Sequence, residues 1–210
     1  MLTEAAAQGV TLCVATPHCV LHGEDGVAAF LLRREKSFAT LHKAMQGSSS
    51  PMPRIVQGAE VYMDHNLLLH EGIEQLSIEG TNCVLVEFPM RAWDPRAAEW
   101  LYSMTLRGMR PVIAHIDRYS FWQQLFHDTA ELDVIYQFNA ESLLSFRGRR
   151  ILKKVIQQGR PYLIASDMHN TTSRPPILKQ VFDKRSRLFA GQCDIFAASR
   201  ERALVNSEST

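Results

Sequence analysis

No stretch of the sequence approaches the ~20 consecutive apolar residues that a membrane-spanning helix needs. The formal net charge is only +1, so no strong field of one sign points to a nucleic acid or a membrane surface as partner. The opening segment MLTEAAAQGV lacks both the basic and the apolar region of a secretory signal. These absences favour a cytoplasmic protein with no membrane insertion and no nucleic-acid partner.

Cysteine is scarce, with four residues and no CxxC spacing, which fits a reduced protein better than a disulfide scaffold. No cysteine is followed six residues later by arginine, so the phosphate-cradling loop of cysteine phosphatases is missing. The G-x-S-x-G and G-x-x-x-x-G-K-[ST] motifs are also absent. The sequence therefore excludes hydrolysis by a thiolate or by an activated serine.

The chain does contain a series of short apolar runs that carry a histidine or a carboxylate at or near their ends. They are TLCVATPH to His18, RIVQGAE to Glu60, CVLVEF with Glu87, RPVIAH to His115, and PYLIASDMH with Asp167 and His169. Helix-like segments separate them, which is typical of buried parallel strands in an α/β fold. We expect one domain spanning residues 1–210, because a chain of this length routinely forms a single unit.

Side chains at the carboxyl ends of parallel strands converge on one rim, where the chemistry of such folds collects. Histidine, glutamate and aspartate together suit divalent metals, so the pattern predicts a metal site. Glu87 is the sharpest signal, because a carboxylate inside an apolar run is costly to bury without a partner. The alternative for Glu87 is a buried pair with arginine, and a single histidine at a strand end is usually structural.

Asp167 and His169 form a D-x-H pair whose two side chains face the same side if the strand continues through them. If the strand ends at Ala165, the pair lies on a loop, and an Asx turn is the alternative. Arg118 and Arg174 follow two of the runs and could hold an anion beside the metals, or could form surface ion pairs. His22 and His65 could border the site, and the remaining histidines are expected on loops or helix surfaces.

The motifs ATPH, GAE, LVEF, AHIDRY, and ASDMHN followed by RPP occur in that order between Gly9 and Phe189. In this order and spacing they resemble the polymerase-and-histidinol-phosphatase (PHP) superfamily. More narrowly, they are similar to the manganese-dependent protein-tyrosine phosphatases of bacterial capsule and exopolysaccharide operons.

The resemblance implies a distorted (β/α) barrel of the PHP type with up to three Mn²⁺ ions. It assigns the metal ligands His18, Glu60, Glu87, His115, Asp167 and His169, with Glu87 bridging two ions. Arg118 and Arg174 match positions that hold the substrate phosphate, and Asp167 or His169 could move protons. The implied substrate is phosphotyrosine on a bacterial tyrosine kinase that controls polysaccharide synthesis.

The family opens with a strand that carries D-x-H-x-H, and this sequence begins at the helix that should follow that strand. We therefore expect a barrel without its first strand, and a first metal site with only Glu87 and Asp167 among its protein ligands. Two alternatives to the tyrosine phosphatase stay open. One is a truncated, catalytically impaired metal-binding remnant, and the other is a phosphatase of a small phosphate ester such as histidinol phosphate.

Overall fold

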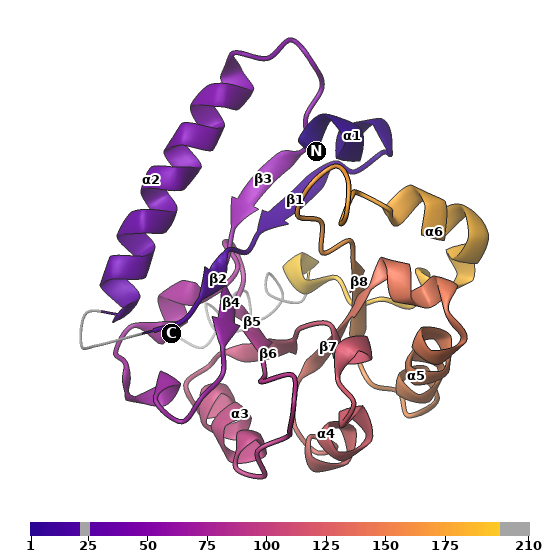
Figure 1. The fold of residues 1–210 in the computed structure, drawn as a ribbon. Coiled ribbons are helices and arrows are strands. Elements are labelled where there is room, and N and C mark those ends of the chain that lie inside the picture. The colour runs from indigo at the N-terminus through magenta and orange to yellow at the C-terminus, as the bar shows by residue number, and fades with distance from the viewer. Residues whose placement is uncertain (22–25, 198–210) are drawn as a thin grey trace, which may run out of the picture.

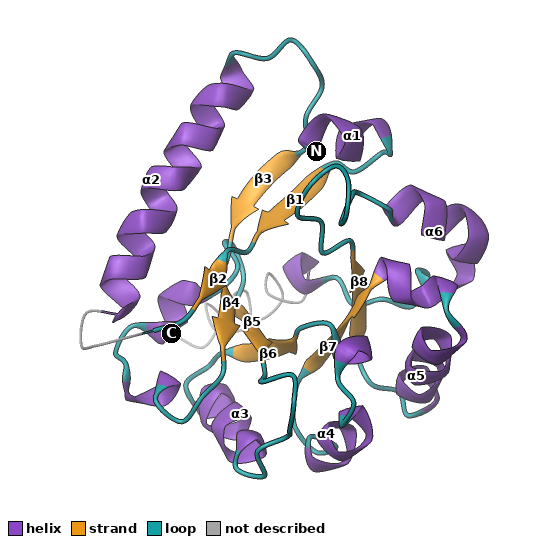
Figure 2. Cartoon of the chain, in the orientation of Figure 1, coloured by secondary structure: helices purple, strands orange, loops and turns teal. Residues whose placement is uncertain are grey.

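Six short parallel strands form the main sheet in the computed structural model, which describes residues 1–21 and 26–197. Figure 1 shows this sheet curving around the centre of the molecule, and Figure 2 shows helices along its outer side. The α/β class with a parallel sheet is confirmed. In sheet order the strands are β2 (His18–Cys19), β4 (Glu60–Tyr62), β5 (Cys83–Glu87), β6 (Arg110–Ile113), β7 (Ile135–Asn139) and β8 (Tyr162–Ala165).

The sequence suggested that each of the first two apolar runs forms a single strand, but both runs break in the middle. Their first halves, β1 (Leu12–Ala15) and β3 (Arg54–Gln57), pair in a separate two-stranded parallel sheet. The breaks fall at Pro17, which has no amide hydrogen for a ladder, and at Gly58. A Cβ at Gly58 would lie 3.0 Å from Cγ2 of Thr16, so the two chains approach closely there. The second halves, β2 and β4, join the main sheet.

Most of the helices connect strands and lie along the outer side of the main sheet, while α1 (Leu2–Ala7) precedes the strands and lies beside β1 and β3 (Figure 1). The other helices are α2 (Gly26–Gln46), α3 (Ala97–Leu106), α4 (Trp122–Asp128), α5 (Phe146–Gln157) and α6 (Leu178–Arg185). Short 3₁₀ turns lie at η1 (Leu67–Leu69), η2 (Ile73–Leu76), η3 (Ile116–Arg118), η4 (Ala140–Leu144) and η5 (Ser186–Leu188). No helix in the described ranges combines the length and the apolar character needed to cross a membrane.

Helix α3 begins at Ala97, after a turn that contains Asp94 and Pro95. The carboxylate of Asp94 accepts a hydrogen bond from the amide of Arg96, and its carbonyl accepts one from the amide of Ala97. Asp94 thus closes a turn before the helix instead of capping the helix itself.

Side-chain alternation divides the core into two clusters on opposite faces of the main sheet. The outward-facing residues, such as Val84, Val86, Tyr136 and Phe138, pack in the larger cluster with residues of the covering helices. The inward-facing residues form a smaller cluster of Val56, Ile78, Cys83, Val112, Ile135 and Ile195, with Leu85 and Leu163 packed against it. Glu87 follows Cys83 and Leu85 at intervals of two residues, so strand geometry places it above this inner cluster.

Candidate metal centre

Three strands bring His18, Glu60 and Glu87 together. His18 and Glu60 are opposite each other in the ladder between β2 and β4, and Glu87 ends the neighbouring β5. One potential ligand atom from each of these residues lies within 4.8 Å of the others. The three residues converge as the sequence predicted, although only Glu87 ends its strand, while His18 and Glu60 begin β2 and β4.

His115 completes this group from the end of β6. Its imidazole is buried, and Nε2 lies 3.0 Å from Oε1 of Glu60 and 3.3 Å from Oε1 of Glu87. Burial lowers the pKa of His115, but the hydrogen bonds to Glu60 and Glu87 prevail and raise it to about 9. The hydrogen bond from His115 lowers the pKa of Glu87, against the effect of burial.

The donor set fits a divalent metal ion. Two carboxylates and two imidazoles within contact of one another offer the oxygen and nitrogen ligands that zinc, manganese and related ions accept. Nδ1 of His115 is buried without a hydrogen-bond partner in the described part of the chain. The alternative of a Glu87–arginine pair is wrong, because the recorded ionic partners of Glu87 are His18 and His115.

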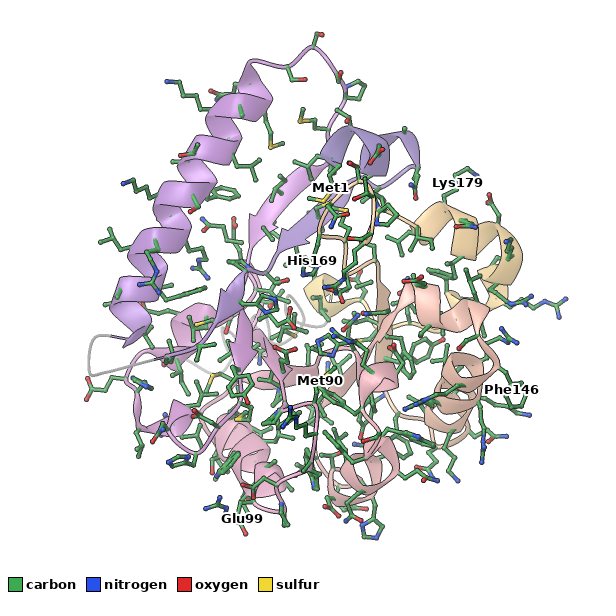
Figure 3. All side chains as sticks on the ribbon, viewed as in Figure 1. Met1, Met90, Glu99, Phe146, His169 and Lys179 are labelled. Atoms are coloured by element: carbon green, nitrogen blue, oxygen red, sulfur yellow. The ribbon has the colours of Figure 1, made fainter. Side chains whose placement is uncertain are left out.

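Asp167 and His169 lie on the loop after β8, because that strand ends at Ala165. Of the two alternatives that the sequence left open, a continuing strand and a loop after Ala165, the structure shows the loop. The ring of His169 lies 6.1 Å from that of His18, centroid to centroid, which places the loop beside the other ligands. In Figure 3, His169 is seen at the centre of the ring of strands.

Asn170 shapes this loop, because its side-chain oxygen accepts hydrogen bonds from the amides of Thr172, Ser173 and Arg174. Asp167 accepts a hydrogen bond of 2.8 Å from the side-chain amide of Asn139. It also pairs with Arg174, whose guanidinium reaches Nε2 of His169 at 3.0 Å. The loop thus holds both expected ligands in a defined arrangement.

Two non-glycine residues of the described chain have positive φ, His115 at 32° and Asp167 at 49°. Such backbone conformations are costly for these residues and persist where the surrounding structure enforces them, often at functional sites. Both residues were singled out from the sequence as metal ligands.

Arg118 lies in η3, three residues after His115, and its side chain is exposed. Its positive charge contributes to lowering the pKa values of both Glu87 and His115, so Arg118 lies within electrostatic reach of the site. His65 makes no recorded contact with these residues in the described part of the chain, and His22 lies outside it.

Gln137 and Asn139 were not predicted as site residues, because the apolar run that forms β7 ends in no acid or imidazole. Gln137 accepts a hydrogen bond from the amide of His115 and donates one of 3.0 Å to Asn139, which in turn holds Asp167. Two amide side chains at alternate positions of the apolar run VIYQFN could have indicated that this strand also contributes to the site. They face the same side of the sheet as Glu87.

The chain is similar to known proteins in both sequence and fold. The sequence profile for capsular polysaccharide synthesis, CpsB/CapC, matches residues 1–194. CapC of Staphylococcus aureus is 28% identical over 218 residues, covering 98% of this chain and 82% of that protein. The tyrosine-protein phosphatase CpsB of Streptococcus pneumoniae is 27% identical over 207 residues, covering 87% of this chain and 79% of that protein.

The fold is similar to one of the crystal structures of YwqE from Bacillus subtilis and CpsB from Streptococcus pneumoniae, described as unique metal-dependent tyrosine phosphatases. The TM-score is 0.68 at 21% identity, over 97% of this chain and 83% of that one. This likeness supports the expected barrel-type fold. The profile match over residues 1–194 confirms the resemblance drawn from the motifs, and the chain belongs to the CpsB/CapC family of capsular polysaccharide synthesis.

Proposed function

We propose that this chain is a manganese-dependent protein-tyrosine phosphatase whose metal ligands are His18, Glu60, Glu87, His115, Asp167 and His169. The observation that carries the proposal is the buried imidazole of His115 between Glu60 and Glu87, with His18 beside both carboxylates. When bound, divalent ions supply the Lewis acidity that activates water and offsets charge on a phosphate. Membership of the CpsB/CapC family and the names of its relatives support phosphotyrosine as the substrate.

The residues around the metal ligands would position the ester. Arg118 is exposed beside Glu87, and its guanidinium would bind two phosphate oxygens as a planar fork. Arg174 would do the same from the opposite loop once it leaves Asp167. A phenolate leaving group needs little protonation, so Asp167 or His169 would serve only to carry protons between the site and solvent.

The protein substrate in this proposal is a bacterial tyrosine kinase that acts in polysaccharide synthesis. This assignment follows the role of the family in capsule synthesis. A cytoplasmic location is part of the same proposal.

The test is hydrolysis of p-nitrophenyl phosphate, a phosphotyrosine peptide and histidinol phosphate by the 210-residue chain, with and without Mn²⁺. We expect Mn²⁺-dependent turnover of the two aryl phosphates, complete loss in EDTA, and little turnover of histidinol phosphate. The variant Glu87→Ala should lose bound metal and activity together, while Glu99→Ala on the surface of α3 should lose neither.

Preference for histidinol phosphate would replace the tyrosine-phosphatase proposal with that of a small-ester phosphatase. Metal binding without turnover of any ester would instead support a non-catalytic metal-binding remnant.

A further inference from the structure

Helix α5 presents an unpaired basic face to solvent. Its sequence FRGRRILKKVIQ contains five basic residues and no acidic residue. Its apolar side, with Ile151, Leu152 and Val155, is buried in the core. Within the described residues, no carboxylate lies at ion-pair distance from the exposed Arg150, Lys153 or Lys154. The free charges therefore remain available to a partner.

This basic face begins beside the turn η3, which carries Arg118. The guanidinium of Arg147, in the first turn of α5, donates a hydrogen bond of 2.8 Å to the carbonyl of Tyr119, the residue after Arg118. From Arg147 the row continues through Arg150 to Lys154, at helical intervals of three and four residues that keep these side chains on one face. The row thus leads from the neighbourhood of Arg118 along the outside of the molecule.

An exposed aromatic side chain marks the same end of the helix. Phe146 precedes Arg147 and is 76% exposed. Figure 3 shows it at the outer edge of the molecule, on the side of α5. An exposed aromatic ring next to unpaired cations is typical of protein recognition surfaces.

We propose that the basic face of α5, formed by Arg147, Arg150, Lys153 and Lys154, docks the acidic segment that flanks the phosphotyrosine of the protein substrate. This inference rests on the proposed function and adds the chemistry by which the substrate is chosen. Carboxylates or further phosphates along that segment would pair with the cations, and Phe146 would contact an apolar side chain next to the phosphotyrosine. The apolar side of α5 is buried in the core, so the helix cannot insert into a lipid bilayer, and purely electrostatic binding to anionic lipid is an outcome of the test below.

The experiment compares two phosphotyrosine peptides, one flanked by glutamates and one by glutamines, together with p-nitrophenyl phosphate. The test variant is Arg150→Glu/Lys153→Glu/Lys154→Glu. The matched control, Arg33→Glu/Lys36→Glu/Lys43→Glu, makes the same charge change on exposed positions of α2.

We expect the test variant to raise KM for the glutamate peptide about tenfold. Three exposed ion pairs between the helix and the peptide are lost, and each is replaced by repulsion between like charges. The other two substrates, and every substrate with the control variant, should change less than about twofold. High salt should remove the wild-type preference for the glutamate peptide.

An unchanged KM for the glutamate peptide in the test variant would overturn the proposal. So would an equal rise in the control variant, because that would be an effect of net charge. A membrane would replace the peptide as the partner if the test variant, but not the control variant, lost binding to phosphatidylserine vesicles while its peptide kinetics stayed unchanged.

If the wild-type chain hydrolyses no ester, the proposed function fails instead. Fluorescence anisotropy of the labelled glutamate peptide then tests the docking face by itself, and equal affinity for wild type and test variant would reject it.

Discussion

At the scale of single residues, His115 combines burial, an unusual backbone conformation and contacts with two carboxylates. It is 2% exposed, adopts a positive φ and shares its Nε2 between Glu60 and Glu87. A protonated imidazole there balances two carboxylates that would otherwise repel each other. A metal ion would have to displace that proton, so metal binding at this site should strengthen as pH rises.

The same contacts predict how the stability of the metal-free protein depends on pH. The pKa of His115 rises from 6.5 to about 9 on folding, since the hydrogen bonds to the two glutamates outweigh burial. A raised folded pKa gives stability that is complete below about pH 6.5 and lost as pH rises through 9. We expect the urea midpoint in EDTA to fall over this window, and His115→Gln to flatten the dependence. The surface variant His42→Gln should retain the slope; a flat profile for the wild type would contradict the prediction.

Arg118 offers a test of substrate binding that is separate from metal binding. Its guanidinium is exposed next to Glu87 and makes no recorded side-chain hydrogen bond in the described structure. Arg118→Ala should keep full metal content, measured by elemental analysis, and reduce kcat/KM for p-nitrophenyl phosphate by about tenfold or more, the typical value of a hydrogen bond to a charged group. Arg54→Ala, at the far end of β3, is the control. Unchanged kinetics for Arg118→Ala would reject the assigned role.

Asn139 tests whether the amides of β7 position the metal ligands. Its side chain donates to Asp167 and accepts from Gln137, so it links two expected ligand loops. Asn139→Ala should weaken Mn²⁺ affinity by about 10- to 100-fold, as for other residues that orient metal ligands. The comparison is Asn82→Ala, which removes a similar hydrogen bond to Gly108 at the opposite ends of the strands. If isothermal titration gives equal Mn²⁺ affinities for both variants, Asn139 is only structural.

At the scale of elements, the join between η4 and α5 depends on one glycine. Gly148 is buried, its amide donates to Oγ of Ser145 at the start of the helix, and an added Cβ would overlap the carbonyl of Ser142. Gly148→Ala should therefore reduce the free energy of unfolding by about 1–3 kcal/mol. Gly47→Ala, where the nearest backbone atom lies 3.7 Å away, should be close to neutral. Equal urea midpoints for the two variants would show that the join relaxes freely.

The elements also show what the sequence could and could not predict. The apolar runs, their parallel order and their convergence at His18, Glu60, Glu87 and His115 follow from local patterns. Pro17 is a local signal for the break of the first run, but the close approach of Gly58 to Thr16 involves residues distant in sequence and could not be predicted. The end of β8 at Ala165 was left open for a similar reason, since the loop that follows it is set by a hydrogen bond that Asn139 donates and by one that Asn170 accepts.

At the scale of the whole molecule, the expected ligands connect five strands whose backbone ladders are short. His18 comes from β2, Glu60 from β4, Glu87 from β5, and His115 follows β6, while the loop of Asp167 and His169 follows β8. A ligand that binds only the folded chain stabilises it by about 2.7 kcal/mol at 100 times its Kd. Metal binding at this site should therefore stabilise the sheet as a unit.

We accordingly expect saturating Mn²⁺ to raise Tm by several degrees in differential scanning calorimetry, and EDTA to reverse the rise. Glu87→Ala should abolish the shift, because it removes the carboxylate between His18 and His115. Glu99→Ala, on the surface of α3, should show the full shift and so exclude a general effect of the salt. If Glu87→Ala kept the full rise in Tm, the stabilising metal would bind elsewhere, and the strand ends would have to be explained as a charge-balanced cluster of imidazoles and carboxylates.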